Sequence, residues 1–355
     1  MVRYLSLNPK VVSNQKNSRS HLCVTFLKSI LCQWRFAPVL LMTALGLSPV
    51  SSYFPSTAHA PRTPTGGFST SDQGIEIRAL AGPVGAEVLG LDLSRPFSER
   101  EFARIHAAHL ERHVVVFRDQ QISPAQQVDF SRLFGPLEIH VLKKFLLSDQ
   151  PEILVVSNII EAGEPIGLGD AGHFWHSDLS YKEKPSLGSL LHAQELPSEG
   201  GDTLFANQHT AYEALPAELR KTIAPLRAEH TYLAKYEELR ARSPWRPRLT
   251  QAQIDEVRPV AHPMVRHHPE TGRAALFVSE HFTTRIVDMP EDESKAMLAE
   301  LFAWSVRPEH LYRHAWQPHD MVFWDNRSVM HLAAGTPDHL RRKLYRTTVE
   351  GDVPV

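Results

Sequence analysis

The sequence contains little cysteine and no strong excess of charge of either sign. Among its 355 residues only Cys23 and Cys32 are cysteines, and both lie in the first 35 positions. The rest of the chain can form neither a disulfide framework nor a thiolate metal site, so any metal there must be held by His, Asp or Glu. A formal net charge of -2 provides no positive field for a phosphate backbone. We therefore expect a small-molecule partner and no nucleic acid.

The chain also lacks a long apolar run. Residues 36–47 are mostly apolar, follow a basic stretch at 28–35 and precede the triplet Ala58-His59-Ala60, a pattern similar to an export signal. The run is too short to span a bilayer, so we expect no stable membrane insertion. A cytoplasmic location is predicted, with export or organelle targeting as the alternative if the signal is genuine. Residues 1–73 are interpreted as an N-terminal extension whose Ser-, Thr-, Pro- and Gly-rich end is a linker, and residues 74–355 as the folded domain.

From residue 75 onward, short apolar runs alternate with turn signals and with two capped helix starts. Ser98 and Ser123 each precede a Glu or Gln three residues later, which predicts helices that begin at 99 and at 124, the second running to Gly135. Two blocks of strands, at about 137–205 and 261–350, flank a more helical middle at 212–257, and a further helix is expected at 290–306. This pattern predicts a mainly β protein with flanking helices, a jelly-roll with a helical insertion. The strand candidates are IEIRAL, AEVLGLDL, VVVFRD, EILVVSN, LGSLLHAQ, RAALFVSE, MVFWDN and KLYRTTV.

The segment FWHSDLSY places His176 and Asp178 one residue apart. On a strand, residues i and i+2 face the same side, so an imidazole and a carboxylate can reach one ion. With 20 histidines in the chain, about one such pair is expected by chance, and a hydrogen-bonded His–Asp pair is the alternative interpretation. A third candidate ligand, His331 in FWDNRSVMHLAAG, strengthens the prediction of a metal site. Two His and one carboxylate leave three coordination positions open, as in non-haem iron oxygenases, whereas a structural zinc site has a fourth ligand.

Two arginines follow the last candidate ligand. Arg342 and Arg346 are four residues apart, so on a strand they share a face. A guanidinium can bind the distal carboxylate of a keto diacid in bidentate fashion, which a lysine cannot reproduce. The alternative is that the arginines belong to a solvent-exposed basic segment, which is the interpretation that we give to Arg341 and Lys343. The hydroxyl of Thr203 is a candidate to share that carboxylate, although a β-branched residue in a strand needs no such role.

With these residues in place, the sequence resembles the taurine dioxygenase family of iron(II)- and 2-oxoglutarate-dependent dioxygenases over nearly all of residues 75–352. The resemblance implies that His176, Asp178 and His331 are the catalytic iron ligands and that Thr203 and Arg342 bind the C5 carboxylate of 2-oxoglutarate. It also implies that Arg346, His140 and the backbone at Leu179 line the substrate pocket. The matching segments are LERHVVVFRDQQISPAQQ, FGPLEIH, WHSDLSY, ELPSEGGDTLFAN, ALFVSEHFTTRIVD, RHAWQPHDMVFWDNRSVMH and HLRRKLYRTTVEGD.

The resemblance implies a double-stranded β-helix, a cupin-like jelly-roll, for the dioxygenase domain at 74–355. It implies an oxidoreductase that uses Fe(2+), 2-oxoglutarate and O2 to hydroxylate a small anionic organic substrate, a sulfonate, sulfate ester or carboxylate, with succinate and CO2 as co-products. A homo-oligomer is expected. Lys143 replaces a pocket tyrosine and Gly172 a pocket asparagine of the taurine enzyme, which argues against taurine as the substrate.

Two other classes of protein remain as alternatives. A β-barrel binding protein with a structural metal has no use for Arg342, and a zinc hydrolase needs a general base beside its metal instead of a keto-acid anchor. A halogenating enzyme would have a small residue in place of Asp178, which would admit halide.

Overall fold

The computed structural model describes residues 68–243 and 245–355. The signal-like segment and the triplet at 58–60 lie outside these residues. No helix in the described part of the chain is long and apolar enough to cross a membrane.

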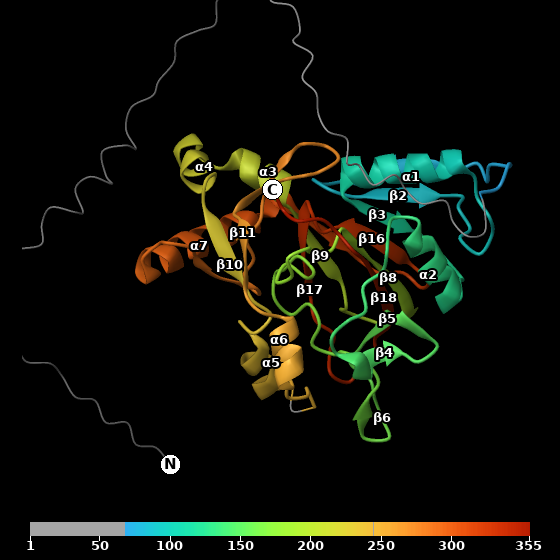
Figure 1. Ribbon diagram of the computed structural model, residues 1–355. Helices are drawn as coiled ribbons and strands as arrows, with labels where there is room; N and C mark the ends of the chain where they lie inside the picture. The colour runs from blue at the N-terminus through green and yellow to red at the C-terminus, as the bar shows by residue number, and fades with distance from the viewer. Residues whose placement is uncertain (1–67, 244) are drawn as a thin grey trace, which may run out of the picture. The chain divides into compact units, whose positions relative to one another are not determined.

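An eight-stranded sheet forms the framework of the fold (Figure 1). Its strand order is β1-β2-β3-β16-β8-β18-β5-β4, and all neighbours are antiparallel except the parallel pair β2 and β3. The strands are β1 (Glu76–Ala79), β2 (Ala86–Leu89), β3 (Val114–Phe117), β4 (Leu146–Leu147), β5 (Gln150–Ser157), β8 (Gly188–Glu195), β16 (Met321–Asp325) and β18 (Lys343–Val349).

A second antiparallel sheet, of order β15-β9-β17, packs on one face of the first. Phe205 of β9 and Val329 of β17 share an apolar cluster with Trp324 of β16 and Leu344 of β18. Two antiparallel sheets around one apolar layer form a jelly-roll, as predicted. The second sheet consists of β9 (Thr203–Asn207), β15 (Leu311–His314) and β17 (Val329–Ala333), and two hairpins add β6 (Ile160–Glu161), β7 (Glu164–Pro165), β12 (Val265–His267) and β13 (Ala274–Leu276).

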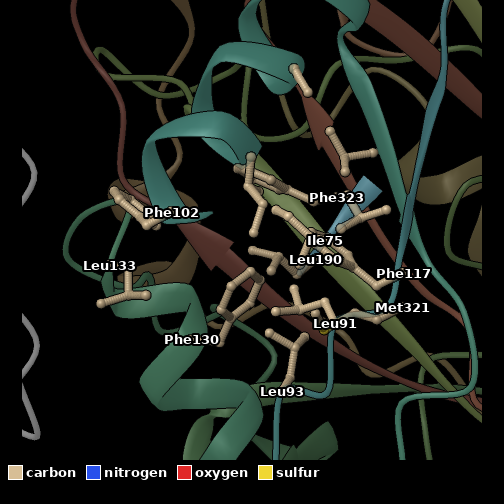
Figure 2. Packing of buried hydrophobic residues seen from close by; sticks show 14 of the residues in the cluster. Ile75, Leu91, Leu93, Phe102, Phe117, Phe130, Leu133, Leu190, Met321 and Phe323 are labelled. Atoms are coloured by element: carbon tan, nitrogen blue, oxygen red, sulfur yellow. The ribbon is translucent and has the colours of Figure 1, made fainter. Parts of the chain in front are cut away.

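Continuous apolar strands explain why the main sheet is covered on both faces. Successive side chains of a strand point to opposite sides. Val115 and Phe117 of β3 accordingly join the cluster under helices α1 (Glu99–Arg112) and α2 (Pro124–Arg132), whereas Val114 and Val116 join the cluster between the two sheets. Figure 2 shows the cluster under the helices, with residues labelled Ile75, Leu91, Leu93, Phe102, Phe117, Phe130, Leu133, Leu190, Met321 and Phe323.

Both predicted capping boxes are present, but α2 ends three residues before Gly135. The N–H groups of Leu133 and Phe134 bond to carbonyls three residues back, which tightens and ends the last turn. Gly135 then has a φ of 152°, and a Cβ on it would lie 3.1 Å from Cγ1 of Val349. The prediction that the helix continues to Gly135 was therefore wrong.

The middle of the chain is less helical than predicted, because a strand divides it. In β10 (Arg227–His230), Ala228 and His230 are buried while Arg227 is exposed, which is the two-residue period of a strand. It pairs with two further strands to give a sheet of order β11-β10-β14. The candidate strand RAALFVSE is likewise shorter than expected, since only Ala274–Leu276 is extended. The remaining elements are α3 (Gln208–Ala214), α4 (Ala217–Ile223), α5 (Tyr236–Arg242), α6 (Gln251–Glu256), α7 (Glu291–Ser305), β11 (Val260–Pro263), β14 (Thr283–Ile286) and the 3-10 helices η1 (Lys143–Phe145) and η2 (Pro308–His310).

Candidate active site

The structure brings His176, Asp178 and His331 together. One ligand atom from each lies within 4.8 Å of the others, and no other such group of His, Cys, Asp or Glu occurs among the described residues. His331 is in β17, and its backbone exchanges two hydrogen bonds with that of His176, N to O of 2.8 and 3.1 Å. This isolated bridge sets the two imidazole rings 4.1 Å apart between centroids.

The route by which Asp178 joins the two histidines differs from the prediction. His176 and Asp178 were expected on one strand, but only His176 makes a β-bridge, and the chain turns at Asp178. Leu179 has a φ of 58°, and the N–H of Lys182 bonds to its carbonyl oxygen at 2.8 Å. The carboxylate thus reaches the imidazoles from a turn, where local hydrogen bonds replace those of a strand ladder.

Hydrogen bonds orient the side chains toward a common point. Nδ1 of His176 lies 2.8 Å from the carbonyl oxygen of Phe174, and because a carbonyl can only accept, the proton is on Nδ1. Nε2 is therefore free to bind a metal, and it lies 3.6 Å from Oδ1 of Asp178. Nε2 of His331 lies 3.7 Å from Oδ2 of the same carboxylate. Two imidazole nitrogens and one carboxylate thus face each other without a direct hydrogen bond between them.

Asp178 is held by residues around it. The hydroxyl of Ser189 in β8 donates to Oδ2 at 2.8 Å, and the side-chain oxygen of Asn326 accepts from the backbone N–H of Asp178 at 3.1 Å. That same oxygen accepts from the indole of Trp324 at 3.0 Å. Such supporting contacts fix the direction of a ligand and are part of a metal site.

The surroundings of the site favour an ionised carboxylate at Asp178 and a neutral imidazole at His331. Burial raises the pKa of Asp178, but Arg346, His331 and His176 together outweigh burial and hold that pKa well below its usual range. Nη1 of Arg346 lies 3.0 Å from Oδ1 of Asp178. Burial, followed by the neighbouring His176, lowers the pKa of His331 well below its usual value. These are the protonation states that metal binding requires.

Arg342 and Thr203 meet at a residue that the sequence did not single out, Trp316. The indole N–H of Trp316 donates to Oγ1 of Thr203 at 3.1 Å, and the guanidinium carbon of Arg342 lies 6.0 Å from the centre of the Trp316 ring. Arg342 is 8% exposed, and its Nε is buried without a hydrogen-bond partner. Burial lowers its pKa to about 10. A buried cation with an unpartnered N–H has the chemistry to bind a carboxylate.

A cavity lies beside the candidate metal ligands. The three residues predicted to line a substrate pocket, His140, Leu179 and Arg346, all border it. Gly172 borders it as well, whereas Lys143 is exposed and outside it. The other lining residues include the aromatic side chains Tyr181, Tyr232, Tyr236, His281 and Phe282.

Sequence reasoning missed Asn326, Trp316 and Arg246. Asn326 lies in a segment quoted for its likeness to the family, and its buried amide holds the turn of Asp178. Trp316 lies in the same matching segment, RHAWQPHDMVFWDNRSVMH, but was not singled out there, and Arg246 comes from a segment that carries no recognisable pattern. Arg246 is 5% exposed, lies in the irregular stretch between α5 and α6, and borders the cavity. Only three-dimensional contact reveals these two side chains.

Comparison with known proteins identifies the family. A model of the taurine catabolism dioxygenase TauD, TfdA family matches residues 76–348. The chain belongs to this family. It is 34% identical over 281 residues, 76% of this chain and 96% of the relative, to the alpha-ketoglutarate-dependent 2,4-dichlorophenoxyacetate dioxygenase of Cupriavidus pinatubonensis. It is 30% identical over 291 residues, 79% of this chain and 91% of the relative, to the alpha-ketoglutarate-dependent sulfate ester dioxygenase of Pseudomonas putida.

The fold comparison agrees with the sequence comparison. The crystal structure of AAD-2 in complex with Mn(II) and N-oxalylglycine matches with a TM-score of 0.66 and 31% sequence identity, covering 79% of this chain and 98% of that chain. Members of the TauD, TfdA family are enzymes with a cupin-like jelly-roll. This chain is therefore a dioxygenase that depends on 2-oxoglutarate and O2, as the resemblance predicted.

Proposed function

We propose that His176, Asp178 and His331 hold Fe(II) and that Arg342 and Thr203 hold the C5 carboxylate of 2-oxoglutarate. The donor set fits ferrous iron, since two imidazoles and one carboxylate leave three positions for 2-oxoglutarate and O2. When bound, the iron supplies the centre at which these two molecules react and the substrate carbon is hydroxylated, with succinate and CO2 as co-products. The observation that carries the proposal is the pairing of this triad with a buried, unpartnered arginine.

The residues around the carboxylate site position the cosubstrate. Trp316 donates to the oxygen of Thr203, so the hydroxyl proton of Thr203 is left to donate to the carboxylate. Arg342 adds charge-assisted hydrogen bonds from a site that excludes water. Gly201 lets the arginine lie close to the backbone, because a Cβ there would be only 3.2 Å from Nε of Arg342.

We propose that the primary substrate is a small organic anion, a sulfonate, sulfate ester or carboxylate, whose anionic group is held by Arg346 and His140 near the backbone of Leu179. Nδ1 of His140 accepts from the N–H of Leu142 at 3.1 Å, which leaves Nε2–H as a donor. Burial, and next the charge of Arg346, lowers the pKa of His140 to about 3, so the imidazole stays neutral and Arg346 supplies the charge. The relatives named for 2,4-dichlorophenoxyacetate and for sulfate esters support this class of substrate.

Taurine fits this pocket less well. Gly172 has a φ of +80°, and a Cβ on it would lie 3.3 Å from Cβ of Ala333 and 3.6 Å from Cε1 of His176. A larger side chain at this position, such as the asparagine of the taurine enzyme's pattern, would be strained and would crowd the candidate ligand. Lys143 is exposed and cannot replace a pocket tyrosine.

A zinc hydrolase is less consistent with the cavity. Besides Asp178, the cavity is lined by one carboxylate, Asp170, and both of its oxygens are bound by Arg246 at 2.8 and 2.6 Å. It is therefore not free to act as the general base that a hydrolase needs. An anchor such as Arg342 also has no role in simple hydrolysis.

The test has two parts. Anaerobic titration with Fe(II) should give saturable binding that each of His176→Ala, Asp178→Ala and His331→Ala weakens sharply, because each removes one of three protein ligands. Succinate formation with Fe(II), ascorbate and 2-oxoglutarate, measured across sulfonates, sulfate esters and aryloxy or alkyl carboxylates, should be stimulated by members of one anionic class. Wild-type Fe(II) affinity in any of the three variants would remove that residue from the site, and stimulation by neutral analogues alone would contradict an anionic substrate.

We further propose a homo-oligomer in the cytoplasm, with residues 74–355 as the catalytic domain. Light scattering after size exclusion measures the mass of the assembly, and fractionation of cells that express the full chain measures its location.

A further inference from the structure

A buried ion pair forms one wall of the substrate cavity. Nε and Nη2 of Arg246 bind the two oxygens of Asp170 at 2.8 and 2.6 Å, and both side chains are at most 4% exposed. Asp170 lies a few residues before His176, whereas Arg246 lies between α5 and α6. The pair therefore joins the segment that leads to the candidate metal site to the insertion.

Arg246 has one donor group to spare. Its third nitrogen, Nη1, is buried and has no hydrogen bond of good geometry within the described residues, although the hydroxyls of Tyr232 and Tyr236 lie near the guanidinium. A buried, unsatisfied N–H costs free energy, and a ligand that accepts from it recovers that cost. The guanidinium carbon of Arg246 lies 4.9 Å from the centre of the Tyr236 ring, so this aromatic side chain helps to hold the guanidinium in place.

We propose that Arg246, fixed by Asp170, is a specificity-determining residue that donates a hydrogen bond to a neutral acceptor on the part of the substrate farthest from its anionic group. This inference rests on the proposed function, in which Arg346 and His140 bind the anionic group. Arg246 and Arg346 border the same cavity as His140, so one molecule can contact both arginines.

Charge decides the kind of group that Arg246 recognises. Arg346 borders the cavity together with His140, and its own carboxylate partner, Asp178, is also a candidate iron ligand. The carboxylate of Asp170 belongs to Arg246 alone, so that pair is neutral as a whole. A second anionic group would meet the repulsion of Asp170, whereas a ketone, amide or ether oxygen meets only the free N–H. The expected substrate therefore has an anionic head and an uncharged acceptor at its other end.

The cavity has room for such a molecule on this side. Gly172, two residues after Asp170, also borders the cavity, and its lack of a side chain leaves space beside the candidate ligand His176. The aromatic wall can pack against an apolar linker between the two polar ends. The departure from the taurine enzyme's pattern at Gly172 is thus explained by a longer substrate.

The experiment compares matched compounds that differ only in the distal acceptor. The probes are hexyl sulfate against 5-oxohexyl sulfate, and phenoxyacetate against 4-acetylphenoxyacetate. Their dissociation constants are measured by calorimetry without O2, with the full chain loaded with Fe(II) and 2-oxoglutarate. In at least one pair the keto compound should bind roughly tenfold more tightly than its parent to the wild type.

The deciding variant is the double change Asp170→Asn and Arg246→Gln, which removes both charges together and leaves no unpaired buried ion. It should lose the keto preference, so that each keto compound binds to this variant with the same dissociation constant as its parent. Arg246→Lys keeps an ion pair with Asp170 but loses the planar guanidinium, so the preference of this variant for the keto compounds should fall at least about threefold. This variant provides a test even if the double variant does not fold. Arg258→Gln, an exposed change on the insertion outside the cavity, should keep the full preference.

Each outcome has a distinct meaning. Equal binding of keto and parent compounds to the wild type in both pairs, or a keto preference that survives in the double variant, would overturn the role of Arg246 while the anion site stands. Failure of all four anions to bind the wild type would overturn the proposed anion site, and this inference with it.

Discussion

Arg342 and Arg346 are four residues apart in the sequence but have different surroundings. Arg342 lies just before β18, and a register shift between Lys343 and Leu344 separates it from Arg346 within the ladder. Arg342 contacts Trp316 and has no carboxylate hydrogen-bonded to it. Arg346 instead lies 3.0 Å from the carboxylate of Asp178. The two guanidiniums therefore have different partners, which supports their proposed assignment to two sites even though their spacing suggests one.

Replacing the two arginines should separate cosubstrate binding from substrate binding. Arg342→Ala should raise the apparent constant for 2-oxoglutarate at least about 30-fold with every substrate, because a charge-assisted contact of roughly 2 kcal/mol or more is lost. Arg346→Gln keeps a donor for Asp178 and should leave 2-oxoglutarate turnover without substrate within about threefold, while the constant for anionic substrates rises. Succinate formation with and without substrate measures both effects. Equal damage to 2-oxoglutarate binding in the two variants would place both arginines at the cosubstrate site.

At the scale of the elements, the small sheet β15-β9-β17 and the loop after β15 position the residues of the proposed cosubstrate site. Thr203 begins β9, and its neighbours across the ladders are His314 and Ala333. The loop that follows β15 places Trp316 over Arg342, so one indole contacts both candidate anchors. The position of the hydroxyl of Thr203 thus depends on a side chain 113 residues away in the sequence.

Trp316→Phe should weaken 2-oxoglutarate binding roughly fivefold, because it removes a hydrogen bond worth about 1 kcal/mol and frees the hydroxyl of Thr203 to rotate. Fe(II) binding should not change, since Trp316 does not contact the candidate ligands. Trp304→Phe is the matched control: its indole also bonds to one oxygen, the carbonyl of Ala211, but from α7 outside the cavity. An unchanged 2-oxoglutarate constant in Trp316→Phe would show that Thr203 does not need the indole.

Sequence patterns predicted the elements whose signals are local. The apolar runs of β3 and β16 and the capping boxes at Ser98 and Ser123 are confirmed, because caps and strand periods depend only on near neighbours. The turn at Asp178 was missed, because the positive φ of Leu179 falls on a residue type that rarely adopts it. The strand β10 was missed because it lies among helices and pairs only with distant segments.

The predicted metal ligands lie together and the predicted substrate-pocket residues border the cavity beside them, whereas long-range contacts decided which other side chains join them. His176 and His331 meet through a bridge across more than 150 residues, and the family pattern was what linked them beforehand. No sequence pattern marks Arg246, since its proposed role follows from its burial and from its unpaired nitrogen. Residues that act through tertiary contact alone leave no periodic signal to read.

At the scale of the whole molecule, the first described residues pack on the domain, although part of them was expected to be linker. The ring of Phe68 lies 5.7 Å from that of Phe102, and the backbone N–H of Gln73 donates to Glu101 at 2.6 Å. The side chain of Gln73 also bonds to the backbone of Asp92 and Pro96. Residues 68–73 therefore contribute to stability.

Two truncations test this contribution. Removal of residues 1–67 should leave the melting temperature and succinate formation of the enzyme unchanged, because all candidate site residues lie between His140 and Arg346. Removal of residues 1–73 should lower the melting temperature by roughly 3 °C or more, since it uncovers Phe102 and removes the hydrogen bond from the backbone of Gln73 to Glu101. Equal melting temperatures for the two truncations would show that residues 68–73 add nothing.

Buried histidines should make the folded state sensitive to acid. Burial lowers the pKa of His109, of His113 and of His230 to about 3, against 6.5 when exposed. Between these values the unfolded chain binds protons that the native protein does not, so stability is full above pH 6.5 and falls as the pH is lowered toward 3. Each such group adds a slope of roughly 1.4 kcal/mol per pH unit well below 6.5. The urea midpoint should therefore be clearly lower at pH 5 than at pH 7.5.

Whether buried histidines cause the acid sensitivity can be tested at one residue, His109. Its ring stacks on Phe323 at 3.9 Å between centroids, and neither ring nitrogen has a hydrogen-bond partner. His109→Phe keeps the packing and removes one titrating group, so the free energy of unfolding should fall less steeply between pH 6 and pH 4, by roughly 1 kcal/mol per pH unit. His339→Phe, at an exposed loop position, should keep the wild-type slope. If His109→Phe is as acid-sensitive as the wild type, protonation of His109 does not limit the stability of the folded protein, and the neighbouring buried carboxylate Asp325 becomes the group to vary next.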